Sequence, residues 1–222
     1  MIKQKKLKQD KMKKVLLIVA TLLVGMQAQA QLVADGGYFH AWENGKSLTY
    51  SSPSQDGLFL GARYNVDLDN WMDGLSFIPG LNFSALKGKV QRQILTAWEV
   101  LPKTTTREIA INMPLQLKYQ YEFMSSFAVY GFAGPTLQLG LLNNIVDKND
   151  NSTMRYNMYK ENKLLVSPRT PFNLYLGLGL GVEVAERIQV NAAFDFGLLN
   201  LTTGTNQKLH RNVLKIGIGY IF

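Results

Sequence analysis

The stretch from Phe172 to Val184 reads FNLYLGLGLGVEV and alternates between two kinds of side chain. The apolar set consists of Leu174, Leu176, Leu178, Leu180 and Val182. The intervening set consists of Asn173, Tyr175, Gly177, Gly179, Gly181 and Glu183. Because successive side chains of a β-strand point to opposite faces of the sheet, the stretch predicts a strand with one apolar face and one face of small or polar residues.

The same alternation recurs along the chain, and no helical period competes with it. The clearest further strands are Leu75 to Ala85, Ile109 to Tyr119 and Ile188 to Leu198. Less regular strands are expected at Leu58 to Val66, Phe127 to Leu139 and Leu214 to Phe222, with a weak first strand near Gly37 to Trp42. We therefore expect eight strands.

The faces of the segment from Phe127 to Leu139 stay open. Tyr130 and Phe132 oppose Val129 and Leu137, so both sets contain large apolar groups. The adjacent Gly134 and Pro135 are typical of a β-bulge, which we expect there.

The connections between these strands alternate in length. The short ones are Asp67 to Gly74, Gln120 to Ser126 and Ala185 to Arg187. The long, polar ones are Glu43 to Asp56, Lys87 to Arg107, Leu141 to Pro171 and Asn200 to His210. Outer-membrane barrels have short periplasmic turns and long outer loops. The pattern predicts an all-β fold, an eight-stranded antiparallel up-and-down transmembrane β-barrel, with the long loops facing outward.

The amino end has the three parts of a secretory signal peptide. Seven lysines precede an apolar run from Val15 to Met26, and Ala28-Gln29-Ala30 follows as a small-residue cleavage site. The run is shorter than the ~20 residues that span a bilayer. We expect residues 1–30 to be removed and residues 31–222 to form one barrel domain in the outer membrane.

The net charge of +8 comes largely from this leader. Residues 1–30 contain seven of the 24 cationic side chains and one of the 16 acidic ones, so residues 31–222 carry +2. A basic protein can bind nucleic acid. Here most of the excess positive charge lies in residues 1–30, which we expect to be removed. Nucleic acid is therefore excluded as an expected partner.

A soluble barrel of the lipocalin kind, with its apolar face inside, is the rival fold. Four features speak against it: glycines on the polar face, loop asymmetry, aromatic residues at the ends of the apolar face, and the carboxyl-terminal pattern. Glycine weakens a solvated strand but suits a crowded lumen. The terminal pattern resembles the insertion signal read by the outer-membrane assembly machinery and comprises Lys215, Gly217, Tyr220 and Phe222.

Charged residues on the polar face would lie in the lumen of such a barrel. They are Arg63, Lys118, Glu183, Asp195 and Lys215. A charge in a narrow, partly dehydrated interior is costly unless it is paired. Asp195 and Lys215 lie at similar heights on neighbouring strands, so we expect them to be within reach of each other.

Several segments resemble the PorT-like outer-membrane β-barrel family of Bacteroidetes over most of residues 36–222. The resemblance rests on Ile109 to Tyr119 with its internal Pro114, Tyr130 to Pro135, the glycine-rich strand Gly177 to Glu183, and Gly197 to Leu201. It implies the fold and an outer-membrane location. Many members of such families have no assigned activity.

Catalytic and metal-binding patterns are weak. The chain has no cysteine, and its two histidines, His40 and His210, have no nearby nucleophile pattern. The segment Asp147 to Ser152 has calcium-like oxygen spacing but lacks the glycine and the bidentate glutamate that calcium loops need. We expect no enzyme activity, no metal and no cofactor, with a lipid-modifying enzyme as the class left open.

The sequence predicts a non-enzymatic barrel with a side-chain-filled lumen that is structural or binds through its extracellular loops. The alternatives are a narrow or gated porin-like transport protein and a component of secretion or outer-membrane biogenesis. Expected partners are outer-membrane lipid, the assembly machinery during insertion, and an extracellular glycan or protein. The loop contact candidates are Tyr156 and Tyr159, which stand among cationic residues.

Overall fold

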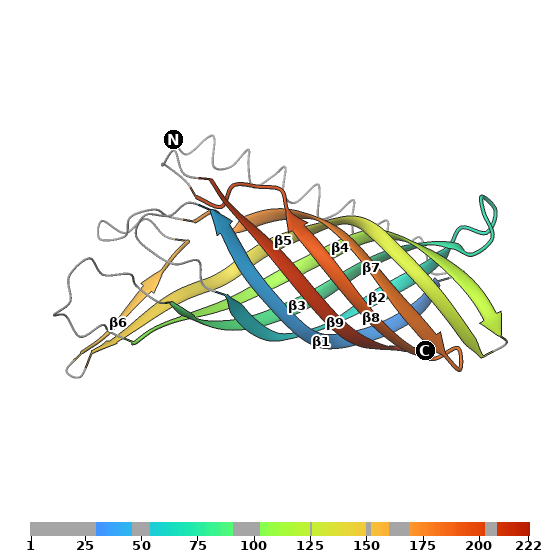
Figure 1. Cartoon of the computed structure of the whole chain (residues 1–222), viewed down its shortest axis with the longest axis horizontal. Helices are drawn as coiled ribbons and strands as arrows, with labels where there is room; N and C mark the ends of the chain where they lie inside the picture. The colour runs from blue at the N-terminus through green and yellow to red at the C-terminus, as the bar shows by residue number, and fades with distance from the viewer. Residues whose placement is uncertain are drawn as a thin grey trace, which may run out of the picture.

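A computed structural model describes residues 30–45, 54–90, 103–124, 126–149, 152–159, 169–202 and 208–222 (Figure 1). The predicted signal peptide, apart from Ala30, lies outside these residues. Within the described ranges, no helix is long and apolar enough to cross a membrane.

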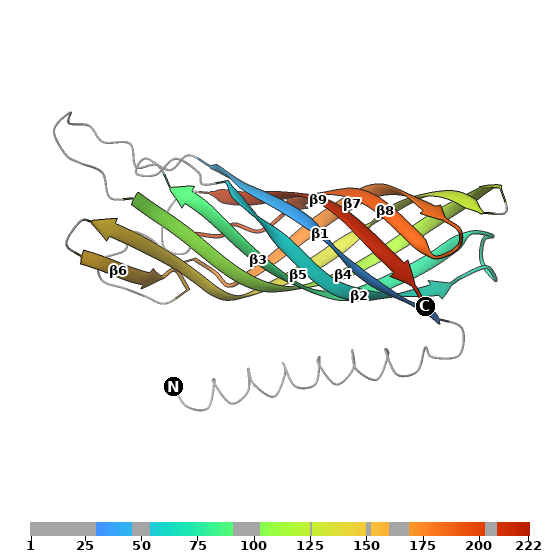
Figure 2. The same ribbon diagram turned by 90° about the horizontal axis from the view of Figure 1, so that it is seen from below.

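Eight of the nine described strands form one closed ring in which each strand is antiparallel to its neighbours. Figures 1 and 2 show this ring from two sides. The ring strands are β1 (Ala30–Gly45), β2 (Gln55–Asp67), β3 (Leu75–Val90), β4 (Lys103–Met124), β5 (Phe127–Asn149), β7 (Phe172–Val184), β8 (Ile188–Gly197) and β9 (Leu209–Ile221). Pairing of β4 with β5 and of β1 with β9 closes the ring. The predicted eight-stranded up-and-down barrel is therefore confirmed.

The two ends of the barrel differ. The β2–β3, β4–β5 and β7–β8 turns lie at one end together with the carboxyl terminus, and we call this the short-turn end (Figure 1). A further strand, β6 (Ser152–Asn157), pairs with β5 at the opposite, long-loop end. It lies outside the ring and continues the sheet beyond the barrel wall (Figure 2).

Several strands are longer than the sequence predicted. The first strand, expected only near Gly37 to Trp42, runs from Ala30 to Gly45 and pairs with both β2 and β9. Strand β4 takes in most of the connection expected at Gln120 to Ser126, and β5 takes in the first part of that expected at Leu141 to Pro171. The alternation of apolar and polar residues stops at the edge of the membrane-facing part of each strand, but backbone pairing continues beyond that edge. The pattern therefore underestimated the lengths of the strands.

The structure also assigns the faces of β5. Tyr130 and Phe132 are buried and point into the lumen, whereas Val129 and Leu139 are exposed on the outside. The expected bulge at Gly134 and Pro135 is wrong, because the pairing of β5 with β7 is continuous through these residues. Two register shifts lie instead in the pairing of β5 with β4, one between Ile109 and Ala110 and one between Glu122 and Met124.

The outer surface carries a continuous apolar band. Large exposed residues on it include Leu60, Leu81, Phe83, Leu117, Leu178, Leu180, Ile216 and Ile218. On β3 the band extends from Leu75 to Ala85, which corresponds to about 25 Å along the barrel axis for strands tilted as in membrane barrels. This height matches the apolar band of outer-membrane barrels.

The lumen is filled by side chains. One cluster of buried residues comprises Phe39, Ala41, Phe59, Leu86, Tyr175 and Val213. A second, nearer the short-turn end, comprises Ile78, Tyr130, Phe132 and Ala193. The glycines of β7 make room for this filling, because a β-carbon on Gly179 would lie 2.3 Å from Phe132 Cζ and one on Gly181 would lie 2.3 Å from Tyr130 Cζ.

This close approach predicts a strong difference between two glycines. Gly179→Ala should lower the free energy of unfolding by about 1–3 kcal/mol through overpacking, since the added carbon also meets the Ala192 carbonyl oxygen at 2.7 Å. Gly131→Ala is the matched control, because its nearest neighbour on the outer face is Leu180 Cδ2 at 3.5 Å. Urea unfolding of the refolded variants measures both, and an equal effect at the two positions would contradict the packed lumen.

Candidate functional site

Near the short-turn end, the lumen contains a network built around Arg63. Its Nε lies 3.0 Å from Asp35 Oδ2, and its Nη2 donates a hydrogen bond to Gln189 Oε1 over 3.3 Å. Gln189 Nε2 in turn donates to Glu183 Oε2 over 3.0 Å. Lys118 extends the network, because its Nζ donates to Gln120 and lies 5.4 Å from the centre of the Tyr130 ring. Three of the predicted lumen charges therefore meet here.

The other two predicted charges meet further along the lumen. Lys215 Nζ lies 2.5 Å from Asp195 Oδ2, and both side chains are largely buried. They stand on adjacent strands, where Lys215 pairs with Ala193. Gly177 lies against the carboxylate, since a β-carbon there would be 2.3 Å from Asp195 Oδ1.

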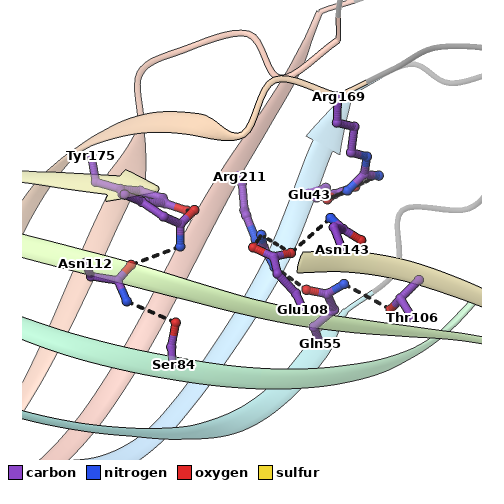
Figure 3. A network of polar contacts seen from close by, with 11 residues as sticks. Glu43, Gln55, Ser84, Thr106, Glu108, Asn112, Asn143, Arg169, Tyr175 and Arg211 are labelled. Carbon is purple, nitrogen blue, oxygen red and sulfur yellow. Dashed lines mark hydrogen bonds and ion pairs between the residues drawn. The ribbon is translucent and has the colours of Figure 1, made fainter. Parts of the chain in front are cut away.

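A chain of neutral hydrogen bonds crosses four strands of the wall (Figure 3). The Tyr175 hydroxyl donates to Gln138 Oε1 over 2.9 Å, and Gln138 Nε2 donates to Asn112 Oδ1 over 3.0 Å. Asn112 Nδ2 then donates to Ser84 Oγ over 3.0 Å. Buried amides that are satisfied in this way hold one another in place and keep the lumen rigid.

The most buried charge pair lies nearer the long-loop end. Arg211 Nη1 is 2.7 Å from both carboxylate oxygens of Glu108, and the Glu108 side chain is fully buried (Figure 3). Arg211 also donates to Gln55, which donates onward to Thr106 Oγ1 over 3.0 Å. Asn143 Nδ2 donates to Glu108 Oε2 over 3.2 Å. The carboxylate thus receives hydrogen bonds from two sides.

Two groups cover this pair at the mouth of the barrel. Glu43 accepts two hydrogen bonds from the Arg169 guanidinium, of which that from Nη2 to Oε2 measures 2.7 Å. Tyr159 covers Gly140, whose β-carbon would collide with the tyrosine hydroxyl. Burial, and secondarily the Glu108 carboxylate, raises the pKa of the Tyr159 hydroxyl. Tyr159 therefore lies inward against the barrel mouth.

Sequence reasoning missed four of the lumen charges. Asp35, Glu43, Glu108 and Arg211 fell outside the predicted strands, although all four lie in strands of the structure. Extending the alternation of the predicted strands past their ends would have found them. Glu108 lies an even number of residues from Lys118, and Arg211 lies an even number of residues from Lys215, so each pair shares one face of its strand. Each of these charges has an opposite partner in the described part of the chain.

The remaining predicted residues have the following positions. Gly217 faces the lumen, whereas Tyr220 and Phe222 are exposed on the outer face, where their rings pack 5.1 Å apart. Tyr156 lies in β6 opposite Ile145. A role of the carboxyl-terminal residues as an insertion signal stays a prediction.

Neither histidine is part of a catalytic arrangement among the described residues. His40 Nδ1 lies 2.6 Å from Asp56 on the outer face, and His210 Nδ1 lies 3.2 Å from the Gly197 carbonyl oxygen. Asp147 belongs to β5 and Ser152 to β6, two strands that pair antiparallel. In the described ranges, no group of three potential metal ligands comes together.

Comparison with solved structures gives distant likenesses, and no curated protein matches the chain. The chain is similar to Neisserial surface protein A, at 16% identity over 87% of this chain and 99% of that one, with a TM-score of 0.48. It is similar to Ail of Yersinia pestis, solved with the heparin analogue sucrose octasulfate, at 10% identity over 87% and 99%, with a TM-score of 0.48. For OprG of Pseudomonas aeruginosa the values are 16% identity over 87% and 96%, and a TM-score of 0.44.

A family model, by contrast, matches nearly the whole chain. The family model described as outer membrane protein beta-barrel domain matches residues 16–222. That range includes every strand of the closed ring. The chain belongs to the outer membrane protein beta-barrel domain family, whose location is the outer membrane.

Proposed function

We propose that the protein is a closed, non-enzymatic outer-membrane barrel that is structural or binds a partner through its long-loop end, which faces the cell exterior. The observation that carries this proposal is the filled lumen. Charged pairs alternate with two clusters of buried apolar residues along the barrel. An eight-stranded barrel has an interior just wide enough for side chains to fill, which favours a closed barrel over a porin.

The side chains that fill the lumen also hold one another. Glu108 on β4 bonds to Arg211 on β9, and Arg63 on β2 bonds to Gln189 on β8. Each link joins strands that are not neighbours in the ring. Opening a path would break such contacts and leave buried charges unpaired, which costs several kcal/mol per pair.

Conductance in planar lipid bilayers tests the closed lumen. The refolded wild-type barrel should give no steady current steps at concentrations where a porin conducts. The companion variant is Gly217→Leu, because a β-carbon there would already lie 3.0 Å from Phe59 Cζ, inside the lumen. Wild-type current that this variant abolishes would place an open path in the lumen and would favour a narrow or gated transport protein.

Binding at the long-loop end stays part of the proposal. Tyr159 covers the barrel mouth, so a glycan or protein ligand of Tyr156 and Tyr159 would meet the rim of the barrel. A pull-down from native membranes, compared with a chain shortened within residues 160–168, tests whether partners depend on this loop. The assembly machinery as a transient partner and the PorT-like assignment stay predictions.

We also propose that residues 1–30 are a signal peptide that is cleaved after Ala30. The support is the lysine-rich start, the short apolar run and the alanines before Gln31. Strand β1 begins at Ala30, so cleavage after Ala30 would remove only the first residue of the strand and leave Gln31 to Gly45 in the barrel. An intact mass of the purified protein that begins at Gln31 is the expected result, and a full-length mass would contradict it.

A further inference from the structure

A row of polar residues faces outward near the long-loop end. It consists of His40, Asp56, Lys87, Arg107 and Asn144, on five consecutive strands of the ring. Each member is the direct cross-strand partner of the next. Directly opposed residues of antiparallel strands project from the same face. These five side chains therefore form one line across the outside of the barrel, the outward polar row.

The outward polar row marks the edge of the apolar band. One step closer to the membrane, the same strands present Tyr38, Leu58, Ala85, Ile109 and Leu142, which are again paired in register. All but Ala85 are large hydrophobic residues that are exposed. On each of these five strands, the change from apolar to polar residues takes place within one pair of positions. This is where lipid hydrocarbon gives way to head groups.

An aromatic group borders the row and supports this depth. The ring of Trp42 lies 5.5 Å from His40 and 5.4 Å from Phe194. Phe194 in turn packs 4.5 Å from Phe196. Aromatic residues gather at the membrane–water interface because one side of the ring meets lipid and the other meets water. The row and this aromatic group therefore lie at the same boundary.

Within the described residues, no ion pair joins Lys87 or Arg107 to an acidic side chain. Lys87 and Arg107 are directly opposite each other, and both are exposed. Like charges in such a pair repel and destabilise the sheet. The nearby Asp56 is engaged elsewhere, because its Oδ1 accepts hydrogen bonds from Tyr38 and His40. Lys89, one step further out on the same face, adds a third cation.

We propose that Lys87 and Arg107, together with Lys89, bind a phosphate group of an anionic glycolipid in the outer leaflet. An arginine binds phosphate through two parallel hydrogen bonds, and lysine adds a point charge. A phosphate between the two cations relieves their repulsion. The acyl chains of the same lipid lie along the apolar positions at Ala85 and Ile109. The inference rests on the proposed orientation, with the long-loop end outside.

The test uses the refolded full-length barrel in detergent and phosphorylated lipid A as the probe. Bound lipid is counted by native mass spectrometry, with the same lipid A after removal of its phosphates as the second probe. The double variant Lys87→Gln with Arg107→Gln should raise the apparent Kd for phosphorylated lipid A by about tenfold or more. Heat-dependent gel mobility shows that this variant folds, as expected when like charges are removed.

Arg187→Gln is the matched control. Arg187 is an exposed cation in the β7–β8 turn at the short-turn end, so its removal should leave lipid A binding unchanged. Wild-type binding that is equal for phosphorylated and dephosphorylated lipid A would overturn the proposal. Unchanged binding by the double variant would do the same. Equal affinity for phosphatidylglycerol would show a general anionic lipid surface and would also overturn it.

A separate experiment tests the proposed orientation, in which the long-loop end lies outside the cell. Because the chain has no cysteine, Lys89→Cys provides a single thiol beside the row. A membrane-impermeant maleimide should label it on intact cells. Absence of labelling would contradict the outward orientation, whereas the binding experiment in detergent does not depend on the side of the membrane.

Discussion

Replacing Glu108 with alanine should lower the free energy of unfolding by about 3–5 kcal/mol, because it leaves the Arg211 guanidinium buried without its counter-charge. The Glu108 side chain is fully buried and Arg211 is 4% exposed. Both hydrogen bonds from Arg211 Nη1, each 2.7 Å long, end on this carboxylate. Urea unfolding of the refolded barrel in lipid vesicles measures the loss.

The control removes both charges at once. Glu108→Met with Arg211→Met retains the volume but leaves no buried charge, and replacement of a buried pair by apolar groups is often nearly neutral. Most of the stability should therefore return in the double variant. If Glu108→Ala is as stable as the wild type, the account of a dehydrated, interlocked lumen is wrong.

Replacing Asp195 with alanine should cost about 3 kcal/mol by the same mechanism, since it leaves Lys215 unpaired. The 2.5 Å contact between Lys215 Nζ and Asp195 Oδ2 lies inside the lumen, with the two side chains 13% and 2% exposed. The double variant with Lys215→Ala should cost less than the sum of the two single variants, because the residues interact directly. The same unfolding assay provides the complete double-mutant cycle.

Asp56, which lies on the outer face, is the control for the effect of Asp195→Ala. Its side chain is 56% exposed, and an exposed ion pair contributes at most about 1 kcal/mol. Asp56→Ala should therefore have a small effect. A cycle for Asp195 and Lys215 that shows no coupling would contradict the pairing, and an effect of Asp56→Ala equal to that of Asp195→Ala would contradict the assignment of the two faces.

Period-two alternation was sufficient to predict the ring and the faces of most strands. In β7 every predicted lumen position is buried or partly buried, from Asn173 to Glu183. The reason is physical: a strand between lipid and a packed lumen has two different environments, so its faces must differ in composition. The prediction of the fold therefore depended on the part of each strand that lies in the membrane.

Beyond the membrane the two faces of a strand no longer differ in composition. The sequence therefore did not predict those parts of the strands. Glu108 and Arg211 lie on strands that continue past the apolar band. There the outer face carries Arg107 and Asn212 rather than leucines, so no alternation marks the strand. The sequence analysis also missed strand β6, which lies outside the ring and, among the described strands, pairs only with β5.

The faces of β5 were undecided because apolar residues fill the lumen as well as cover the outside. Tyr130 pairs with Gly181, and Phe132 with Gly179. Large rings opposite glycines on a neighbouring strand are a known way to fill space in a sheet. Considering the two strands together would have placed both aromatic residues inside. The sequences of the two neighbouring strands together indicate which face of β5 points into the lumen, whereas either sequence alone does not.

The account depends most directly on which face of the strands meets lipid. Because the chain has no cysteine, single cysteines at Gln189, Val190, Asn191 and Ala192 of β8 can each carry a nitroxide label, attached before refolding into vesicles. Electron paramagnetic resonance then measures collision with oxygen, which concentrates in lipid. We predict high oxygen accessibility at Val190 and Ala192 and low accessibility at Gln189 and Asn191. The reverse alternation, or none, would contradict a lipid-facing apolar surface around a filled polar lumen.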